Sequence, residues 1–369
     1  MYTLMNKDIP IGEIEILNDF TVSWKREYID IPNWLRDINR WVNERIAYWK
    51  IESSISDNSK LSDIIKACNL ASLSDTLWIK EETEEVTWKT ISLFSNPFDT
   101  NKSNKVLNGE RISLSKHKEQ CSPEYTTLGS YDKCWKRENG NIVLVKKGLE
   151  KYSEGSGNEP FSEYYASYLL KNLLGLEPYR DFVPYTVSRY NESYFVSKCT
   201  CFTSEKYGMI PMSLADVNRY STEEFLKFMH KLNPYSEWLF RWMSVFDFIS
   251  LNPDRHVGNI GLIIDNDTLN IVRMAPIFDN NLSFYPKITI LDRPLNRISA
   301  SLSEIKPKYD INFGETLQQV LTRDMINQLE KMYTHWKNNK FTRVDGISQE
   351  RIDIMNKVTK LKVEKILNL

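Results

Sequence analysis

The residues best suited to chemistry lie close together in the second half of this chain. Four polar residues fall within six positions, and an apolar segment then leads to a further carboxylate: Asp254, Arg255, His256, Asn259 and Asp279. Phosphoryl transfer requires an acid/base carboxylate near the acceptor hydroxyl and oxygen ligands for magnesium on the triphosphate. Asp254 suits the first task. Asn259 and Asp279 suit the second, because Mg²⁺ prefers carboxylate and amide oxygens.

The segment between these polar groups must position them. Residues 260–264 and 269–274 read as β-strands, and Asn266-Asp267 between them is a favourable hairpin turn. Because an antiparallel hairpin brings the outer ends of its strands together, we expect Asp279 to face Asn259.

The order of these residues resembles a known kinase family. D-R-H-x-x-N at residues 254–259, followed by an apolar residue, Asp279 and Asn280, resembles the catalytic and metal-binding loops of HipA-like kinases and, more distantly, of phosphatidylinositol 3- and 4-kinases. Ordinary protein kinases carry H-R-D-x-x-x-x-N and D-F-G. Here His256 follows the aspartate, and Asn280 replaces the phenylalanine, which argues against an ordinary eukaryotic-type kinase. Asp and Asn also form turns, so the prediction depends on the whole ordered set.

Two further residues of the loop are candidates for the catalytic group. We expect His256 to brace the loop by hydrogen bonding rather than to act as a base. Arg255 could neutralise phosphate charge or pair with a carboxylate, and the sequence leaves both roles open.

A second group of candidates precedes this loop. Gly129 and Lys133 match the G-x-x-x-K phosphate loop of HipA-like kinases, and Ser130 follows the glycine. A glycine lets the backbone approach phosphates, and successive N–H groups can form an anion-binding nest. The predicted strand 141–145 then leads into Lys146, which resembles the lysine that contacts the nucleotide phosphates. Lys147 points to the opposite face of a regular strand, so Lys146 is preferred.

The resemblance also implies a partner for this lysine and a hinge. Glu163, near the start of a predicted helix over 163–174, resembles the glutamate that pairs with the lysine, and Glu159 is the fallback. The alternative for Glu163 is an acid that complements the helix dipole. A predicted hairpin, 185–190 with 194–198, runs into Cys199 and Cys201, where backbone groups of the hinge would bind adenine. Both cysteines are expected to be packing residues, since no second cysteine pair accompanies them.

The resemblance further implies regulation. In HipA-like kinases a hydroxyl residue three positions before the loop glycine is an autophosphorylation site, and Thr126 stands there with Thr127 beside it. A phosphate at this point would compete with the nucleotide or displace the loop. The alternative is that both threonines end a strand, for which threonine is well suited.

Composition sets the remaining limits. The chain has 369 residues, 41% hydrophobic content and a net charge of −1. The length predicts about two or three domains, and the balanced charge does not indicate nucleic acid as a partner. Five cysteines without a C-x-x-C pair fit a reducing cytoplasm. No secretory signal and no apolar segment of membrane-spanning length are recognised, so we expect a soluble cytoplasmic protein.

The outer parts of the chain supply structure without recognisable chemistry. Residues 11–17 alternate like a strand, one amphipathic helix is expected from Pro32, a short helix over 61–68, and a polar connector over 96–110. After the hinge we expect helices over 223–232, 235–251, 313–338 and 348–369, and an irregular substrate or activation segment over 289–306. Four residues are expected to form the buried stripe of the last helix: Ile354, Met355, Val358 and Leu361.

These observations predict an α+β chain with a two-lobed, protein-kinase-like fold. Residues 120–202 would form a small antiparallel-sheet lobe, 203–369 a mainly helical lobe, and 1–119 an added N-terminal domain. The resemblance implies an ATP- and Mg²⁺-dependent Ser/Thr protein kinase, which could be a toxin-type kinase with a separately encoded antitoxin. Two alternatives remain, a lipid (phosphoinositide-like) kinase and a nucleotide-binding pseudokinase scaffold. The lack of a polybasic segment argues against the lipid kinase.

Overall fold

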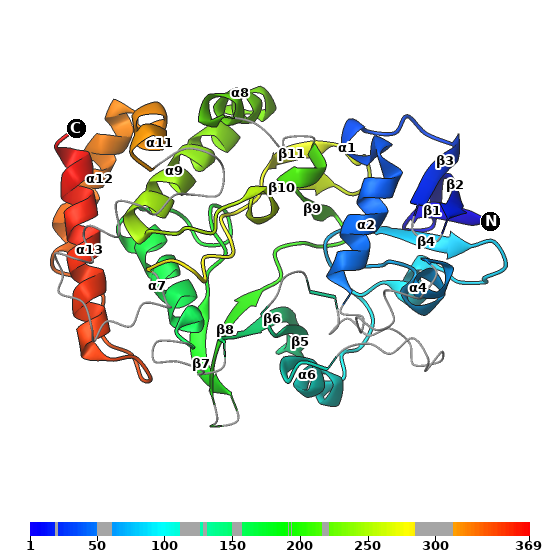
Figure 1. The fold of residues 1–369 in the computed structure, drawn as a ribbon, viewed down its shortest axis with the longest axis horizontal. Helices are drawn as coiled ribbons and strands as arrows, with labels where there is room; N and C mark the ends of the chain where they lie inside the picture. Colours follow the sequence, from blue (N-terminus) through cyan, green and yellow to red (C-terminus); the bar gives the residue numbers. More distant parts are fainter. Residues whose placement is uncertain are drawn as a thin grey trace.

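Within the residues that it describes, the computed structural model contains three antiparallel sheets, with helices before, between and after their strands. Figure 1 shows the N-terminal sheet at one end of the molecule and the C-terminal helices at the other, so that the two termini lie far apart. The mixed α and β composition agrees with the predicted fold class. The structure describes residues 1–18, 21–49, 61–110, 126–127, 131–149, 157–190, 192, 194–215, 221–284 and 313–369.

The first sheet has the order β3-β2-β1-β4, and its bounds are Tyr2–Asn6 (β1), Ile9–Asn18 (β2), Thr21–Glu27 (β3) and Leu77–Glu81 (β4). Between β3 and β4 lie α1 (Asn33–Arg36), α2 (Ile38–Tyr48) and α4 (Leu61–Cys68), and α5 (Trp88–Ile91) follows. The strand expected over 11–17 and the helix over 61–68 are both present.

The prediction of a single helix from Pro32 is wrong, because the chain forms two helices there. Asp37 lies between α1 and α2, and its carboxylate accepts the backbone N–H of Arg40, 2.9 Å away. Aspartate is a favoured N-cap because it satisfies an N–H that has no partner inside the helix. The apolar stripe is nevertheless buried on both sides of the break, at Trp34 and Trp41.

The connector expected over 96–110 contains a helix, α6 (Thr100–Leu107). The Asp99 carboxylate caps its first turn by accepting the N–H groups of Asn101 and Lys102. Val106 and Leu107 are fully buried. Figure 1 shows α6 beside β5 of the next sheet, where burial of these two residues stabilises an otherwise polar helix.

The second sheet has the order β5-β6-β8-β7, with bounds Lys133–Glu138 (β5), Asn141–Lys147 (β6), Thr186–Tyr190 (β7) and Tyr194–Thr200 (β8). Helix α7 (Glu159–Asn172) packs against it and begins earlier than expected, with Pro160 in its first turn. The register pairs Lys133 with Lys146 on the neighbouring strand. The expected hairpin before the hinge is formed by β7 and β8.

The third sheet has the order β11-β10-β9, with bounds Tyr207–Pro211 (β9), Gly261–Asp265 (β10) and Ile271–Met274 (β11). The antiparallel pairing of β10 with β11 confirms the expected hairpin. Short 3₁₀ turns follow β9 (Met212–Ala215) and precede β10 (Val257–Asn259). The β10–β11 hairpin therefore lies between Asn259, which comes before β10, and Asp279, which comes after β11.

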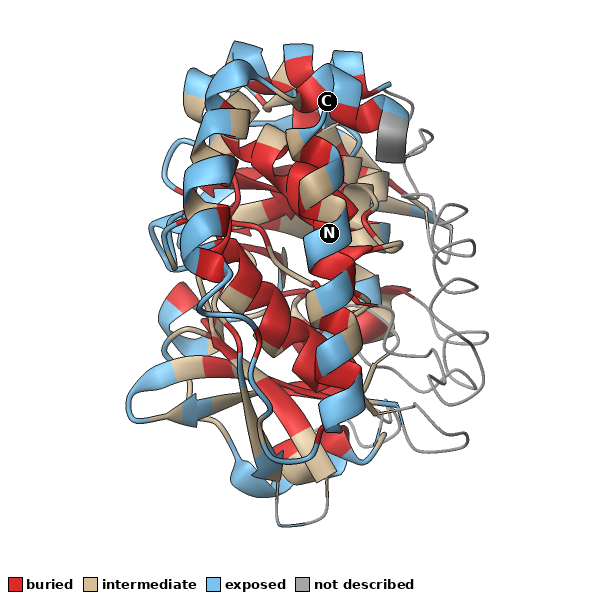
Figure 2. Cartoon of the chain, turned by 90° about the vertical axis from the view of Figure 1, so that its left-hand side faces the viewer, coloured by how far each residue is buried: buried red, intermediate tan, exposed pale blue. Residues whose placement is uncertain are grey.

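The helices of the C-terminal part are α8 (Thr222–Leu232), α9 (Pro234–Ser250), α11 (Phe313–Val320), α12 (Arg323–Trp336) and α13 (Gln349–Leu367). Figure 2 shows that the helices on this side turn their buried residues inward and their exposed residues outward. Helix α9 leads to the candidate catalytic residues and is the central helix of the core, as expected.

Two expectations for these helices need correction. The helix expected over 313–338 is divided, because the Thr322 side chain accepts the N–H of Met325 and starts α12. Leu361 on α13 is 49% exposed, whereas Met355 and Val358 are buried. The contact face of α13 therefore turns away from Leu361. The irregular segment expected over 289–306 lies outside the described residues.

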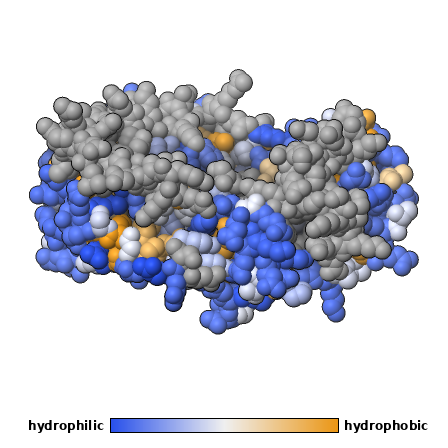
Figure 3. All heavy atoms as spheres, turned by 60° about the horizontal axis from the view of Figure 1, so that its bottom comes forward, coloured by the Kyte–Doolittle hydropathy of each residue, from blue (hydrophilic) through white to orange (hydrophobic). Residues whose placement is uncertain are grey.

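The surface and the cysteines agree with the composition. Figure 3 shows a face that is mainly hydrophilic where its atoms are coloured, with a small group of hydrophobic residues towards the C-terminal helices. Cys68, Cys134, Cys199 and Cys201, the cysteines within the described ranges, form no disulfide with one another. Among the helices that the structure describes, none is both long and apolar enough to cross a membrane.

Candidate functional site

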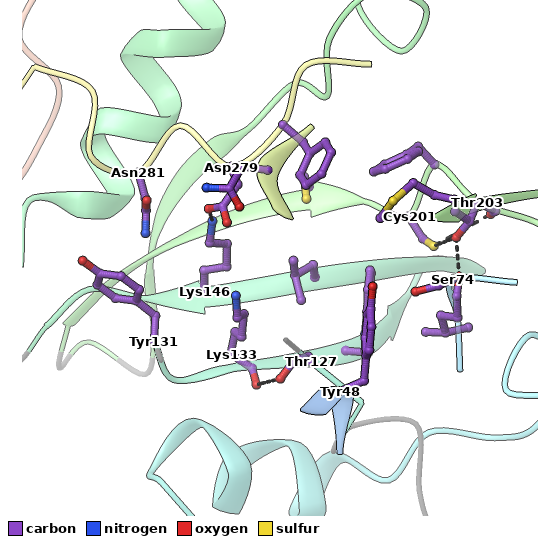
Figure 4. A pocket seen from close by; sticks show the side chains of 18 of the residues that line it. Tyr48, Ser74, Thr127, Tyr131, Lys133, Lys146, Cys201, Thr203, Asp279 and Asn281 are labelled. Atoms are coloured by element: carbon purple, nitrogen blue, oxygen red, sulfur yellow. Dashed lines mark hydrogen bonds and ion pairs between the residues drawn. The ribbon is translucent and has the colours of Figure 1, made fainter. Parts of the chain in front are cut away.

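A cavity of about 360 Å³ lies where the second sheet, the third sheet and the N-terminal region meet (Figure 4). Most of the residues predicted to bind nucleotide or metal line this cavity, although they come from segments far apart in the sequence. The lining consists of Tyr48, Leu73, Ser74, Thr126, Thr127, Tyr131, Lys133, Trp135, Leu144, Lys146, Tyr185, Cys199, Thr200, Cys201, Phe202, Thr203, Met209, Asp254, His256, Gly258, Asn259, Phe278, Asp279 and Asn281.

Lys146 is the cation at the centre of the charged end. Its ammonium donates to the Glu163 carboxylate and to Asp279 Oδ1, the latter at 2.5 Å. Burial lowers the pKa of Lys146, but the two carboxylates outweigh burial and raise the pKa above its ordinary value, so the side chain remains charged. Lys147 lies over the Tyr194 ring on the other side of the strand. The structure thus brings together the lysine and glutamate that the sequence favoured.

Glu159, the fallback for Glu163, lies elsewhere. Its carboxylate is buried and accepts the N–H of Leu149 at 3.3 Å. Glu163 is fully buried, and its second oxygen accepts the backbone N–H of Asn280 at 2.9 Å. Helix α7 therefore fixes both the lysine and the segment that carries Asp279.

Asp279 has an unusual backbone conformation. Its φ of 55° lies in the left-handed region, which Asp and Asn adopt more readily than other residues with a Cβ. Burial raises the pKa of Asp279, but the cations Lys146 and Lys133 outweigh burial and hold the pKa well below its usual range. The cations thus favour the ionised form of this carboxylate on the cavity wall.

The loop after α9 places Asp254, His256 and Asn259 on the cavity wall. The Asn259 side-chain amide donates to the Asp254 carbonyl at 3.0 Å, so the amide oxygen is the group left for a ligand. His256 Nδ1 accepts the N–H of Gly258 at 3.0 Å and caps the short 3₁₀ turn before β10. This contact is the bracing role expected of His256.

Arg255 is turned away from the cavity and has no exposed surface. Of the two roles left open by the sequence, the structure shows carboxylate pairing: its guanidinium binds both carboxylate oxygens of Asp247, at 2.9 and 3.1 Å. It also donates to the carbonyls of Asn259 and Phe278 and to the Asn280 side chain. Arg255 thus connects helix α9, the Asp254 loop and the Asp279 segment from behind, as a positioning residue.

Lys133 is a second buried cation beside Lys146. It is 8% exposed, and Figure 4 shows it next to Lys146 on the cavity wall. Burial lowers its pKa below the ordinary value of 10.5, with Lys146 acting in the same direction and Asp279 opposing. Such an ammonium favours an anionic ligand, because a negative charge nearby offsets the free-energy cost of burying the ammonium. Gly129 and Ser130 lie outside the described residues.

The residues expected at the hinge line the other end of the cavity. The Cys201 N–H donates to the Ile142 carbonyl at 2.8 Å, which extends the pairing of β8 beyond its end. Cys199 is buried, and burial raises its thiol pKa to about 12. Both cysteines are therefore packed, protonated thiols, and the Phe202 and Phe278 rings nearby are 5.8 Å apart between centroids.

Thr126 and Thr127 line the cavity as well, and both are buried. Thr126 forms an isolated bridge with Trp49, and its carbonyl accepts the Trp135 indole N–H at 2.7 Å. The Thr127 hydroxyl donates to the Lys133 carbonyl at 3.2 Å.

Several lining residues were not predicted. Tyr131 and Asn281 flank the charged end, and Tyr48, Leu73 and Ser74 come from the region to which the sequence assigned no chemistry (Figure 4). Asn281 could have been found as the next polar residue after Asp279-Asn280. The other residues had no usable signal, because their place in the site depends on how distant segments pack.

The donor set fits magnesium bound together with a triphosphate. Mg²⁺ in such sites uses one or two protein oxygens and takes its other ligands from phosphates and water. The Asp279 carboxylate and the Asn259 amide oxygen would hold the ion here. Within the described part of the chain, no cluster of three or more His, Cys, Asp or Glu residues forms a metal cage.

Comparison with solved structures relates this geometry to known proteins. A chain of the Shewanella oneidensis MR-1 toxin–antitoxin complex of HipA, HipB and operator DNA aligns over 100% of both chains, with 9% identity and a TM-score of 0.54. The Helicobacter pylori proinflammatory kinase CtkA aligns over 64% of this chain and 91% of its own, with 19% identity and a TM-score of 0.49. No family model and no curated protein matches the sequence. At these identities the similarity concerns the fold alone, and at that level the predicted resemblance is confirmed: this chain has a HipA-like fold.

Proposed function

We propose that this protein is an ATP- and magnesium-dependent phosphotransferase that modifies Ser or Thr hydroxyls of a protein and is able to modify itself. The observation that carries the proposal is the ion-paired group of Lys146, Glu163 and Asp279, which shares one cavity with Asp254 and Asn259. A phosphotransferase needs a cation for the phosphates, ligands for magnesium and a carboxylate for the acceptor.

In this proposal the chain consists of two kinase lobes and an added N-terminal domain. Residues 120–202 supply the sheet with Lys133 and Lys146, and residues 203–369 supply Asp254, Asn259 and Asp279. Residues 1–119 form a further domain packed against both. A cavity lined by all three parts supports this division.

Each residue then has a role in the transfer. Lys146 and Lys133 bind and orient the nucleotide phosphates, while Glu163 holds Lys146 in place. Asn259 and Asp279 hold magnesium, which neutralises charge on the phosphates. Asp254 accepts the proton of the acceptor hydroxyl as the new oxygen–phosphorus bond forms at the γ-phosphorus and the bond to the β–γ bridging oxygen breaks, which leaves ADP.

The choice of a protein acceptor rests on the similarity of fold. The HipA neighbour is found in a complex with HipB and operator DNA, and a separately encoded antitoxin is the corresponding partner proposed here. A phosphoinositide-like kinase would use the same cavity, but no polybasic segment attracts the chain to anionic lipid. A pseudokinase scaffold would bind nucleotide without transfer, and the presence of Asp254, Asn259 and Asp279 on the cavity wall favours the enzyme over it.

The decisive experiment compares the wild type with Asp254→Asn in transfer of labelled phosphate from Mg-ATP to the protein itself and to a whole-cell protein extract. The substitution removes the acid/base group and keeps the size of the side chain, so transfer should fall about 10²- to 10⁴-fold while ATP affinity changes little. Asp345→Asn, at a carboxylate that is 71% exposed, is the matched control. An Asp254→Asn variant that transfers phosphate at the wild-type rate would remove Asp254 from the mechanism.

A further inference from the structure

We propose that Tyr48, Leu73 and Ser74, here called the N-terminal wall, contact the nucleoside part of the nucleotide, so that the N-terminal region takes part in selecting the ligand. The inference rests on the proposed nucleotide site and assigns one end of it to a part of the chain without recognisable chemistry. All three residues line the same cavity as Lys146 and Asp254.

The cavity is divided by polarity. Figure 4 shows Lys133, Lys146, Asp279, Asn281 and Tyr131 towards one end. The N-terminal wall lies towards the other end, together with Cys201 and Thr203 of the hinge segment. A nucleotide has the same division, with charged phosphates at one end and an uncharged, flat base at the other. When the phosphates lie on the lysines, the base must extend towards the uncharged end.

The wall is firmly attached to the hinge side of the cavity. The Thr203 hydroxyl donates to the Leu73 carbonyl at 2.5 Å, and the Met209 N–H donates to the Ser74 carbonyl at 2.6 Å. These two bonds join the loop before β4 to the chain immediately after the expected hinge. Leu73 and Ser74 are therefore held through their backbone carbonyls, one by a side-chain hydroxyl and the other by a backbone N–H.

Tyr48 is held by a buried cation behind it. The Arg45 guanidinium lies 4.8 Å from the centroid of the Trp41 ring and 5.7 Å from that of the Tyr48 ring. It is ion-paired with Asp75 and donates to the Ser72 hydroxyl. Because Asp75 neutralises this arginine, the surface that the wall presents to the cavity consists of an aromatic ring, a hydroxyl and an aliphatic side chain. This combination suits an uncharged heterocycle with few polar edges.

The test measures binding of ATP and of adenosine to the full chain, by calorimetry for ATP and by adenosine competition against a fluorescent ATP analogue. Contact of a base with an aromatic ring corresponds to a loss of roughly 5- to 150-fold in affinity when the ring is removed. Tyr48→Ala should weaken ATP and adenosine by similar factors in this range. Lys133→Ala should weaken ATP and leave adenosine unchanged, because adenosine has no phosphate.

Two further variants test whether a loss of affinity is caused by a loss of structure. Tyr48→Leu keeps most of the volume without the aromatic face and should show the same loss of affinity for both ATP and adenosine, with an unchanged melting temperature. Tyr28→Ala removes a 43% exposed tyrosine of the same region that does not line the cavity, and it should bind both ligands as the wild type does.

The outcomes separate this inference from the proposed function. Wild-type affinity of Tyr48→Ala and Tyr48→Leu for ATP and adenosine would overturn the role of the wall while leaving the kinase proposal intact. A loss confined to ATP would also overturn it, since the wall would then act on the phosphates. A wild type that binds neither ATP nor adenosine would refute the nucleotide site itself, and both proposals with it.

Discussion

Two lysines share the charged end of the cavity, but their surroundings give them different properties. Lys146 is neutralised by two carboxylates, which raise its pKa and keep it charged. Lys133 is buried beside Lys146, and burial lowers its pKa. Lys146 is therefore suited to orienting a ligand, whereas Lys133 is the residue whose charge state responds to the arrival of a phosphate.

Proton uptake during nucleotide binding follows from this difference. Phosphate charge near Lys133 favours its charged form and raises the pKa that burial had lowered, so binding draws a proton wherever free Lys133 is partly deprotonated. ATP affinity should be constant below this lowered pKa and should fall as the pH rises through it towards 10.5. Calorimetry in buffers of different ionisation enthalpy measures the uptake directly.

Lys133→Gln is the control for this effect, because glutamine donates hydrogen bonds without titrating. At neutral pH the ATP affinity of this variant should be lower than that of the wild type. As the pH rises further, the affinity of the variant should not show the decline that the wild type shows. An equal decline in both proteins would assign the effect to another group.

At the scale of elements, Arg255 joins three segments that the proposed mechanism requires to be held in fixed positions. From one buried position it contacts Asp247 on α9, the Asn259 carbonyl before β10 and the Phe278 carbonyl after β11. The sequence showed Arg255 as a member of the catalytic loop but could not show which side of the loop it faces, since Asp247 belongs to a helix that reads as ordinary core.

Arg255→Met should destabilise the fold rather than act on chemistry alone. Removal of the arginine leaves the fully buried Asp247 without its cation, and breaking a buried pair costs about 3–5 kcal/mol. Chemical denaturation measures the loss in the free energy of unfolding. The double variant Arg255→Met with Asp247→Leu should recover much of the stability but not the activity, because the two loops remain unconnected. Full recovery of activity would contradict the positioning role.

Regulation by Thr126 is a further prediction at this scale. The bridge to Trp49 and the bond from the Trp135 indole hold this residue in the cavity wall, where it is 3% exposed. A phosphate carries about −1.5 to −2 charges and has no room there, so autophosphorylation requires the segment to leave the wall and should lower ATP affinity. Mass spectrometry after incubation with Mg-ATP checks this, with Thr126→Val as the control. An active enzyme without phosphate on residues 126–130 would refute it.

The elements that local patterns determine were predictable. The β10–β11 hairpin and the cavity face of Lys146 follow from strand periodicity and a turn signal, and both are present. The break at Asp37 and helix α6 were missed, because a capping carboxylate and burial against another sheet decide them. The exposed Leu361 shows the same limit. The helical period gives a stripe, while the neighbouring helices decide which part of it is covered.

At the scale of the whole molecule, the N-terminal region is docked by backbone and buried polar contacts. The Trp34 indole donates to the Leu269 carbonyl at 2.9 Å, and the Asn6 amide donates to the Asn266 carbonyl at 2.5 Å. Strand β9 fits against the loop before β4 at Gly208, where a Cβ would lie 2.8 Å from the Ser74 carbonyl oxygen and 2.5 Å from Asn266 Oδ1. Only glycine allows this approach.

Gly208→Ala should therefore weaken the docking of the N-terminal region. The added methyl group meets a backbone carbonyl that cannot move without shifting the N-terminal wall, and such overpacking costs about 1–3 kcal/mol. Both the melting temperature and the adenosine affinity should fall. Tyr207→Ala, at a 45% exposed neighbour on the same strand, should leave adenosine affinity unchanged. A Gly208→Ala protein with wild-type stability would show that the contact is easily relieved.

The cavity is lined by separate parts of the chain, and this affects how firmly those parts stay docked to one another. A ligand that touches both the N-terminal wall and the lysines of the second sheet binds only while these parts are docked. By mass action it then stabilises the docked state, by about 2.7 kcal/mol when its concentration is 100 times its dissociation constant. The N-terminal region would thus become more resistant to proteolysis and hydrogen exchange as the nucleotide concentration rises. The fraction of molecules in which this region is docked would increase with the nucleotide concentration in the cell.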